Sequence, residues 1–382
     1  MTRPDIDPVA AFLEPRHSQV AAAVNTFGQN QLVRKPDPDT DAEARIRARA
    51  LVPLLAAAGL YNAVKKLDLR AVSLIREGLA WHSPLADEVY ALQALGSMPI
   101  RLGGSEPLQA RWLPEIDGGA LMCGFAMTEM DAGSDVGAMT TRATKDGGQW
   151  VLEGRKSFIS NAGIADVYTV FASTDPKAGA KGISAFVVPA DTPGLTFVGA
   201  QVMSAPHPLG ELHFERCRIP ADHMLGEPGR GLGLGLATLD RLRATVGAAA
   251  CGMAARALDE AVAHVKSRTQ FGKPLADFQL TQARIAEMAT ELAAARLLVY
   301  RAAWAKDQGA ERVTLESAMA KSYATEAAQR IVDGAVQLLG GRGVLASHPV
   351  DRLYRAVRSL RIYEGTTEIQ RLLIAREVLG GA

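Results

Sequence analysis

Cysteine, aromatic residues and an excess of either charge are all scarce in this sequence. The 382 residues include 3 cysteines and 5% aromatic residues, and 42 basic against 41 acidic side chains leave a formal net charge of +1. The sequence also lacks a long run of like charge. Because nucleic acids and anionic membrane surfaces attract an excess of positive charge, neither is expected as the main partner.

The few cysteines and histidines are not spaced as disulfide partners or metal ligands. Cys123, Cys217 and Cys251 are far apart, odd in number and outside any Cys-x-x-Cys pair, so we predict buried thiols. The 7 histidines show neither His-x-x-x-His nor His-Glu-x-x-His spacing, and no metal site is expected.

A long hydrophobic run is missing as well. The segment MTRPDIDPVA carries proline and aspartate where a secretory signal needs apolar residues, and no stretch is long enough to span a bilayer. We therefore expect a cytoplasmic protein without membrane insertion. With 48% hydrophobic and 22% charged residues, the composition is that of a globular protein with one large core or two to three domains.

The pattern of the chain changes twice. Residues 1–120 are helical in character, whereas residues 121–225 contain short β-rich runs separated by proline, glycine and aspartate. A turn signal at 145–148 before Trp150 predicts a hairpin, and further strands are predicted at 167–173, 183–190, 194–199 and 211–219. This spacing is typical of a small all-β barrel or sandwich.

Residues 226–382 return to helical periodicity. One long helix is predicted around residues 285–299, and another from Thr314 to Leu339 that ends at two glycines. Long helices of this kind pack as a bundle. Three glycines at 231–235 resemble a phosphate loop, but no βαβ context surrounds them, so we expect a helix start with small packing residues. The predicted fold class is α+β.

The segment 361–370 contains the best candidate for a catalytic residue. Glu364 and Gly365 precede two threonines and a set of apolar residues at helical spacing, Ile369, Leu372 and Leu373. Thr367 and Gln370 form the pattern of a capping box, which predicts that a helix starts there. Glu364 is then on a loop whose glycine allows close approach of a ligand, and it is a candidate general base. A solvated loop glutamate is the alternative.

Two predicted strand ends and one helix end carry possible ligand-binding groups. The segment 125–135 offers the Thr128 hydroxyl and backbone N–H groups with little side-chain bulk, which can hold a phosphate or the edge of a heterocycle. The segment 156–161 places Ser160 at another strand end, so both could face one planar ring system. Arg268 suits a diphosphate, or it complements a helix dipole.

Taken together, five segments resemble the acyl-CoA dehydrogenase family in order and spacing: FAMTEMDAGSD, KSFISN, RTQFGKPLADFQ, QLLGGRG and RIYEGTTEIQRLLIARE. The similarity extends from about residue 113 to residue 380. It implies an N-terminal helical domain at 1–120, a middle β-barrel domain at 121–225 and a C-terminal four-helix bundle at 226–382. It also implies FAD and a homotetramer built as a dimer of dimers.

The resemblance assigns roles by position. Residues expected to line the flavin and its surroundings are Phe125, Met127, Thr128, Gly133, Ser134, Phe158 and Ser160, with Ser160 near N5. Those expected to contact a FAD shared between subunits are Arg268, Gln270, Phe271, Gln279, Gln337, Gly340 and Gly341. Cofactor contacts just after the base are expected from Thr366 and Glu368. Acyl-CoA contacts are expected from Ser134, Asp240, Arg243 and Gly365.

The family reaction forms an α,β double bond in an acyl-CoA thioester and passes the electrons to an electron-transfer flavoprotein. Glu364 matches the base that takes the α proton, while flavin N5 takes the β hydride. The backbone N–H of Glu364 and a ribityl hydroxyl of FAD are expected to hold the thioester oxygen. Some branches supply the glutamate from a helix position that Leu242 occupies here, and leucine cannot act as a base.

The match is incomplete in several places. Met130 stands for the usual proline, Phe158 for the usual tryptophan, and the family's glycine-rich stretch is absent around 59–70, so the acyl group is not specified. His207 lies where relatives often carry a Gly-x-Arg pattern. It is either a contact for a polar acyl group or CoA, or a loop histidine between two prolines.

Three other functions remain open from the sequence. The first is the same chemistry on an acyl group tethered to a carrier protein. The second is a flavin oxidase or monooxygenase, and the third is a non-catalytic binding subunit of the same fold.

Overall fold

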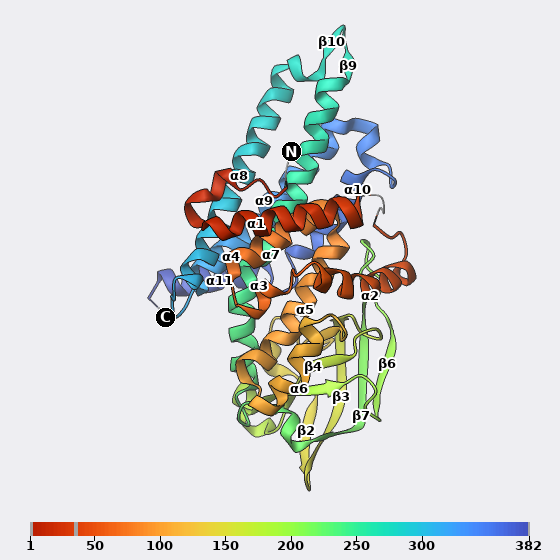
Figure 1. Cartoon of the computed structure of the whole chain (residues 1–382), viewed down its shortest axis with the longest axis vertical. Coiled ribbons are helices and arrows are strands. Elements are labelled where there is room, and N and C mark those ends of the chain that lie inside the picture. The colour runs from red at the N-terminus through yellow and green to blue at the C-terminus, as the bar shows by residue number, and fades with distance from the viewer. Residues whose placement is uncertain (1–2, 34–36, 381–382) are drawn as a thin grey trace. The chain divides into compact units, whose positions relative to one another are not determined.

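The computed structural model describes residues 3–33 and 37–380, which form two compact units (Figure 1). The first unit comprises residues 1–37, 66–87 and 240–382, and the second comprises residues 38–65 and 88–239. The long helix α7 (Gly231–Ser267) begins in the second unit and continues into the first. Each unit has its own set of helices, and the second contains the large sheet.

The first unit begins with three short helical segments. They are the 3-10 helix η1 (Asp7–Phe12), α1 (Pro15–Phe27) and the π-helical turn η2 (Gly28–Leu32). Helix α4 (Leu69–His82) is buried along most of its length because it contacts α1 on one side and α8 on another. Asp68 caps it by accepting a hydrogen bond from the Ala71 amide at 3.0 Å.

The remaining helices of the first unit form the predicted bundle. With α7 they are α8 (Gln279–Asp307), α9 (Thr314–Leu339), α10 (Pro349–Leu360) and α11 (Thr367–Val378). The predicted bounds of α9 are confirmed, and Gly340 ends it with a φ of 58°. A Cβ atom on Gly247 of α7 would lie 2.8 Å from Val299 and 3.2 Å from the Ala320 carbonyl oxygen. The helices therefore approach closely because the residues between them are small.

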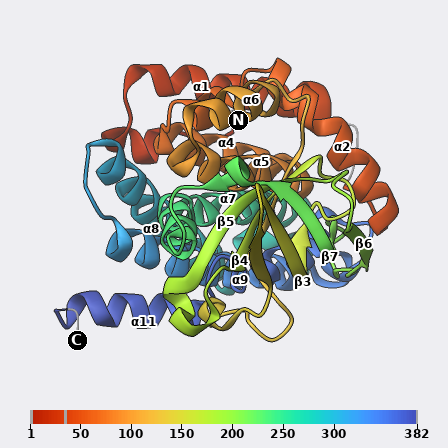
Figure 2. The same ribbon diagram turned by 90° about the horizontal axis from the view of Figure 1, so that it is seen from below.

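The second unit is built around one eight-stranded sheet (Figure 2). Its strands are β1 (Cys123–Ala126), β2 (Arg142–Asp146), β3 (Gln149–Ser160), β4 (Val167–Ser173), β5 (Ile183–Pro189), β6 (Leu195–Ala200), β7 (Leu209–Pro220) and β8 (Met224–Leu225). The order is β6-β7-β3-β2-β4-β5-β8, with β1 paired to β4. The β1–β4 and β2–β4 pairs are parallel, and the others are antiparallel.

Both faces of this sheet are covered. One core contains Trp150, Phe186 and Phe214, and the other joins Phe171 to Trp112 of α6 (Glu106–Asp117). Every residue of β4 is buried, as expected for a strand between two cores. The other helices of the unit are α2 (Asp41–Ala57), α3 (Asn62–Lys65) and most of α5 (Pro84–Gly103).

The sequence-based fold prediction is confirmed in its main features. Helical N- and C-terminal regions flank a central sheet, and the predicted hairpin is the β2–β3 pair, which turns at Gly147 with a φ of 61°. Gly235 is a packing residue of α7, because a Cβ atom there would lie 2.2 Å from the Met127 methyl carbon. All three cysteines are buried thiols.

Two searches of the molecule concern membrane spans and metal sites. Among the described residues, no helix is long and apolar enough to cross a membrane. Nor do residues 3–33 and 37–380 bring together three histidine, cysteine or acidic side chains able to hold a metal ion.

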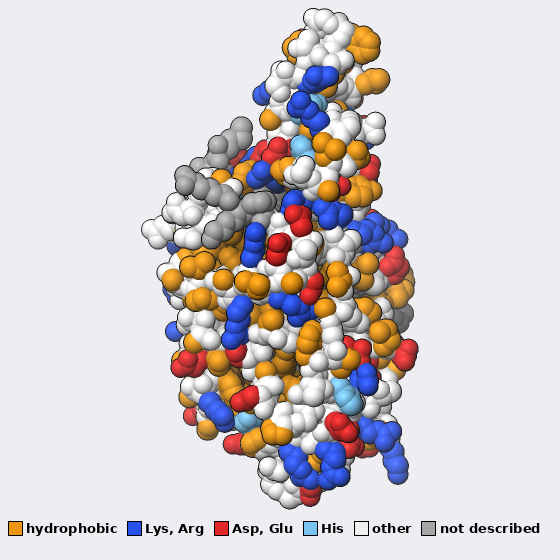
Figure 3. Space-filling view, turned by 90° about the vertical axis from the view of Figure 1, so that its right-hand side faces the viewer, with side chains coloured by type: hydrophobic (Ala, Val, Ile, Leu, Met, Phe, Trp, Pro, Cys, Tyr) orange, Lys and Arg blue, Asp and Glu red, His pale blue; other side chains and the backbone are white. Residues whose placement is uncertain are grey.

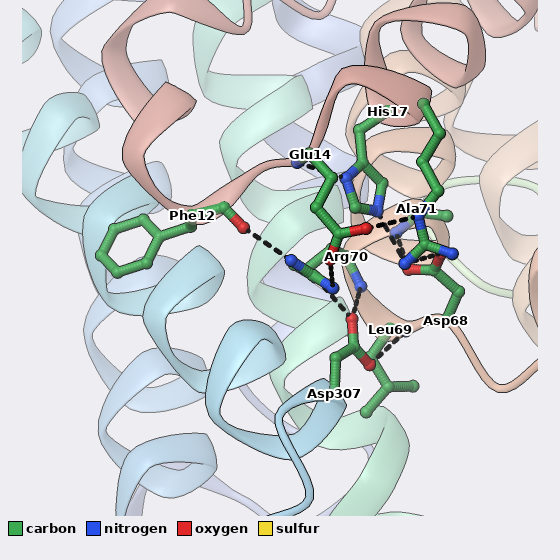
Figure 4. Close-up of polar contacts among 9 residues, drawn as sticks. Phe12, Glu14, His17, Asp68, Leu69, Arg70, Ala71 and Asp307 are labelled. Carbon is green, nitrogen blue, oxygen red and sulfur yellow. Dashed lines mark hydrogen bonds and ion pairs between the residues drawn. The ribbon is translucent and has the colours of Figure 1, made fainter.

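Arg70 joins the N-terminal segment to the helices of the first unit (Figure 4). Its Nε lies 2.8 Å from Asp307 Oδ2, at the end of α8, and its Nη2 lies 2.6 Å from Glu14 Oε1. Its Nη1 donates to the Phe12 carbonyl oxygen at 3.1 Å. Because the side chains of Arg70 and Asp307 are only 3% and 6% exposed, this is a buried ion pair.

We expect Arg70→Met to lower the thermal unfolding midpoint. The substitution keeps an aliphatic side chain but leaves Asp307 charged and buried, which costs about 3 kcal/mol or more. Arg155→Met removes a half-exposed arginine that pairs with Glu211 and should change stability by about 1 kcal/mol or less. Similar midpoints for the two variants would contradict the role given to Arg70.

Candidate active site

Glu364 lies between α10 and α11 in the first unit, on backbone that few residues adopt. Its φ is 54°, and that of Gly365 is 87°. A left-handed conformation at a non-glycine residue costs of order 1–3 kcal/mol and persists only where the surroundings impose it. The loop is therefore held by other interactions.

Lys321 and Gln370 hold this loop. The ammonium of Lys321 donates to the carbonyl oxygens of Tyr363 and Gly365, at 2.9 and 2.5 Å. The Gln370 side chain donates to the same Gly365 oxygen at 2.9 Å. Both side chains are fully buried, so two donors from different helices, α9 and α11, fix the carbonyls on either side of Glu364.

The start of α11 corrects one prediction. Thr366, not Thr367, is the N-cap, and its hydroxyl accepts a hydrogen bond from the Ile369 amide at 3.3 Å. Thr367 is already helical and donates its hydroxyl to Glu326 Oε1 at 2.8 Å. The predicted capping box fails because Gln370 turns toward the Gly365 carbonyl instead of the cap.

The carboxylate of Glu364 has an unusual environment. Its Oε2 atom is buried without a hydrogen-bond partner among the described residues. Burial raises the pKa of Glu364 above its ordinary value, although the nearby Arg76, Lys321 and Arg243 oppose the rise. A carboxylate with a raised pKa is a stronger base, so the chemistry expected of Glu364 suits its surroundings.

Arg76 is a charged neighbour of Glu364 that the local sequence pattern does not predict. Its Nε and Nη2 pair with the two oxygens of Asp87 at 2.8 and 2.9 Å, and its Nη1 donates to the Thr245 hydroxyl at 3.0 Å. Arginine and aspartate are both buried, at 2% and 0% exposure. An arginine within the apolar run 69–80 was the available signal, since a buried charge needs a partner.

The residues expected to contact the acyl-CoA occur in both units. Asp240, Arg243 and Gly365 belong to the first unit, and Ser134 belongs to the second. Arg243 is buried and pairs with Asp240 at 3.0 Å, and burial lowers its pKa. Leu242 is buried beside it and provides no ionisable group.

In the second unit, the end of β3 contacts the segment that follows β1. The Ser157 amide donates to the Thr128 carbonyl oxygen at 3.0 Å, which places the two segments side by side. Phe158 follows with a φ of 58° and is half-exposed. Met127 is buried, Phe125 and Thr128 are partly buried, and Gly133 and Ser134 are exposed. The hydroxyls and the exposed turn at Gly133 and Ser134 suit the polar edge of a flavin, and the half-exposed ring of Phe158 suits its face.

A buried ion pair supports the turn after β1. Lys156 donates to Glu129 Oε1 at 2.8 Å and to the Met127 carbonyl oxygen at 3.0 Å. Glu129 also accepts from the amides of Thr140 and Thr141. Burial alone would raise the pKa of Glu129, but Lys156 and these donors lower it to about 2. Burial lowers the pKa of Lys156 to about 8.

The residues expected to reach a neighbouring subunit's FAD are exposed on the first unit. They lie on the hairpin β9 (Thr269–Gln270) and β10 (Lys273–Pro274), at the start of α8 and at the end of α9. Phe271, with a φ of 50°, is 92% exposed at the hairpin turn. Figure 3 shows hydrophobic and basic side chains on this projecting end. The set comprises Arg268, Gln270, Phe271, Gln279, Gln337, Gly340 and Gly341.

Comparison with known proteins identifies the family. The models "Acyl-CoA dehydrogenase, middle domain" and "Acyl-CoA dehydrogenase, C-terminal domain" match residues 124–217 and 229–379. A probable acyl-CoA dehydrogenase FadE25 of Mycobacterium tuberculosis is 42% identical over 315 residues, which cover 82% of this chain and 81% of that protein. The chain therefore belongs to the acyl-CoA dehydrogenase family, whose reaction is the dehydrogenation of an acyl-CoA.

Solved structures agree with this assignment. Butyryl-CoA dehydrogenase from Megasphaera elsdenii is 33% identical with a TM-score of 0.89, over 96% of this chain and 99% of that one. Glutaryl-CoA dehydrogenase from Mycobacterium smegmatis, in complex with FADH2, is 29% identical with a TM-score of 0.86. The match covers 97% of this chain and 96% of that one. Members of this family are FAD-dependent flavoproteins.

We expect the stabilising effect of the Glu129 carboxylate to depend on pH. Its pKa in the folded protein, about 2, is below its ordinary value of 4.5, so the charged form stabilises the fold above pH 4.5. That contribution is lost as the pH falls toward 2. The gap in unfolding midpoint between wild type and Glu129→Gln should therefore narrow across this window.

The exposed carboxylate of Glu153, on β3 with Lys156, provides the control. Glu153→Gln corrects for the change in net charge. If the difference in unfolding midpoint between wild type and Glu129→Gln stays constant from neutral pH down to about pH 2, the stabilising role of the ion pair is contradicted.

Proposed function

We propose that Glu364 is the general base of an FAD-dependent α,β-dehydrogenation of an acyl-CoA thioester, with electrons passed to an electron-transfer flavoprotein. The observation that carries this proposal is the Glu364 carboxylate, whose Oε2 atom is buried without a hydrogen-bond partner among the described residues and whose pKa is raised by burial. A group of that kind is suited to taking a proton from weakly acidic carbon. Leu242 cannot replace it.

The reaction begins at the Cα–H bond of the acyl group. Glu364 takes the α proton on its carboxylate, and its position is set by the carbonyl contacts of Lys321 and Gln370. Its backbone N–H holds the thioester oxygen, where a donor is typically worth ~3 kcal/mol of transition-state stabilisation. Bound FAD supplies the acceptor for the β hydride.

Each unit contains residues that we assign to the cofactor. Thr128, Ser134 and Ser160 provide hydroxyls in the second unit, and the half-exposed Phe158 provides an aromatic face. Just after the base, Thr366 is the N-cap of α11 and Glu368 lies in its first turn. Because the residues around Phe271 project from the first unit, we assign them to a FAD shared with another subunit of a homotetramer.

We expect Glu364→Gln to retain FAD and lose at least ~100-fold in turnover, the usual contribution of a general base. Glutamine preserves the size of the side chain but cannot accept the α proton. Turnover is measured as acyl-CoA-dependent reduction of an artificial electron acceptor, and FAD content from the visible absorbance of the purified protein.

Glu377→Gln is the matched control, since it removes a partly exposed carboxylate from α11. Turnover within a few-fold of wild type is expected for this control. Glu364→Gln turnover near wild type, with FAD bound, would exclude Glu364 as the base.

A further inference from the structure

A single peptide group connects Lys321 to the chemistry at Glu364. The Lys321 ammonium donates to the Tyr363 carbonyl oxygen at 2.9 Å. That carbonyl belongs to the same peptide group as the Glu364 N–H, and this peptide bond is trans. Because a trans peptide group is planar, its C=O and its N–H point in opposite directions. Lys321 therefore sets the direction of the Glu364 N–H as well as that of the carbonyl it contacts.

The Glu364 N–H is available to a ligand. Among the described residues, this amide has no hydrogen-bond acceptor. The amides on either side of it are engaged with the end of α10, since Tyr363 donates to the Ser359 carbonyl oxygen at 3.2 Å and Thr367 donates to the Arg361 carbonyl oxygen at 3.0 Å. Both ends of the loop are thus anchored, and the amide of the proposed base is left as a free donor.

The backbone at Glu364 has an alternative conformation that would remove this donor. Its φ of 54° is in the left-handed region, which is unfavourable for a residue with a side chain. If the Tyr363–Glu364 peptide group rotated by half a turn, this φ would return to the ordinary negative range. The carbonyl oxygen would then point where the N–H points now, so the site would lose a donor and gain an acceptor.

Lys321 opposes that rotation. Its side chain is fully buried, and its ammonium donates to the carbonyl oxygens of Tyr363 and Gly365. After the rotation the ammonium would face the Glu364 N–H instead of a carbonyl oxygen. Because a buried cation that loses an acceptor is destabilised, the buried charge maintains the left-handed conformation.

We propose that Lys321 is a positioning residue for proton abstraction, because it holds the Glu364 N–H in the direction of the thioester oxygen. This role rests on the proposed function, in which that N–H stabilises the negative charge that develops on the oxygen. The hydrogen bond from Lys321 also polarises the peptide group, which makes its N–H a stronger donor.

The test compares two variants that each remove one side-chain donor from the loop. Lys321→Met removes the donor to the Tyr363 carbonyl oxygen. Gln370→Leu removes the donor to the carbonyl oxygens of Glu364 and Gly365, at 3.4 and 2.9 Å, which belong to other peptide groups. Both changes loosen the loop, but Lys321→Met also releases the peptide group that carries the Glu364 N–H.

The readout is the infrared stretching frequency of the thioester carbonyl in a bound enoyl-CoA, the product of whichever acyl-CoA reduces the bound FAD. An isotopic label at this carbonyl separates its band from the amide bands of the protein. Hydrogen bonds to a carbonyl oxygen lower its stretching frequency. We expect the band in the Lys321→Met complex to shift back toward that of free enoyl-CoA, and the band in the Gln370→Leu complex to stay close to that of wild type.

Turnover provides a second measure. Loss of an oxyanion donor commonly lowers the rate by ~100-fold or more, so Lys321→Met should lower kcat by at least ~10-fold. KM should change less, because the charge on the oxygen develops in the transition state. Lys321→Gln keeps an N–H donor on a side chain one bond shorter and should show smaller effects of the same sign. It replaces Lys321→Met if that variant does not fold.

Equal band positions in wild type and the position-321 variant would overturn the inference. So would equal shifts in that variant and Gln370→Leu, since a general loosening of the loop would then be sufficient. A wild-type complex whose carbonyl band coincides with that of free enoyl-CoA would instead contradict the proposed function, as would a protein whose FAD no acyl-CoA reduces. The two failures are therefore distinguishable, because the wild-type complex is measured first.

Discussion

The active-site proposal depends on one constraint, the position of the Glu364 carboxylate. Its loop has two successive left-handed residues, a conformation that does not persist without support. Lys321 supplies that support from a buried position on α9 by donating to the carbonyls on both sides of the glutamate. Because an ammonium buried in this way needs acceptors, the strained loop and the buried lysine stabilise each other.

The buried charges of the protein fall into two kinds. Arg70 with Asp307, Arg76 with Asp87, and Lys156 with Glu129 are paired at 2.8 Å and surrounded by further hydrogen bonds. Such pairs fix geometry more than they add stability, since desolvation offsets much of their attraction. Glu364 differs because one of its oxygens is buried without a hydrogen bond. A general base must keep a lone pair available, and Glu364 Oε2 does so.

Periodicity and turn residues predicted the elements, but not the contacts between them. The runs at 167–173 and 314–339 carry strong local signals, and β4 and α9 have those bounds. The capping-box pattern predicts Thr367 as the cap because Gln370 follows it by three residues, but the Thr367 hydroxyl donates instead to Glu326, a residue distant in sequence. Tertiary packing likewise sets the contacts of Lys321, Arg76 and His207. Their partners are distant in sequence, so a short stretch of sequence does not reveal them.

The central claim is that this protein oxidises an acyl-CoA at the Cα–Cβ bond. The most direct measurement is an anaerobic titration of the purified yellow protein with a panel of acyl-CoAs that differ in chain length, branching and ring content, following the visible absorbance of the flavin. We expect one class of acyl-CoA to bleach the flavin and to yield the corresponding enoyl-CoA. A protein that carries FAD but is bleached by no member of the panel would contradict it, and would favour a carrier-protein substrate or oxygen chemistry.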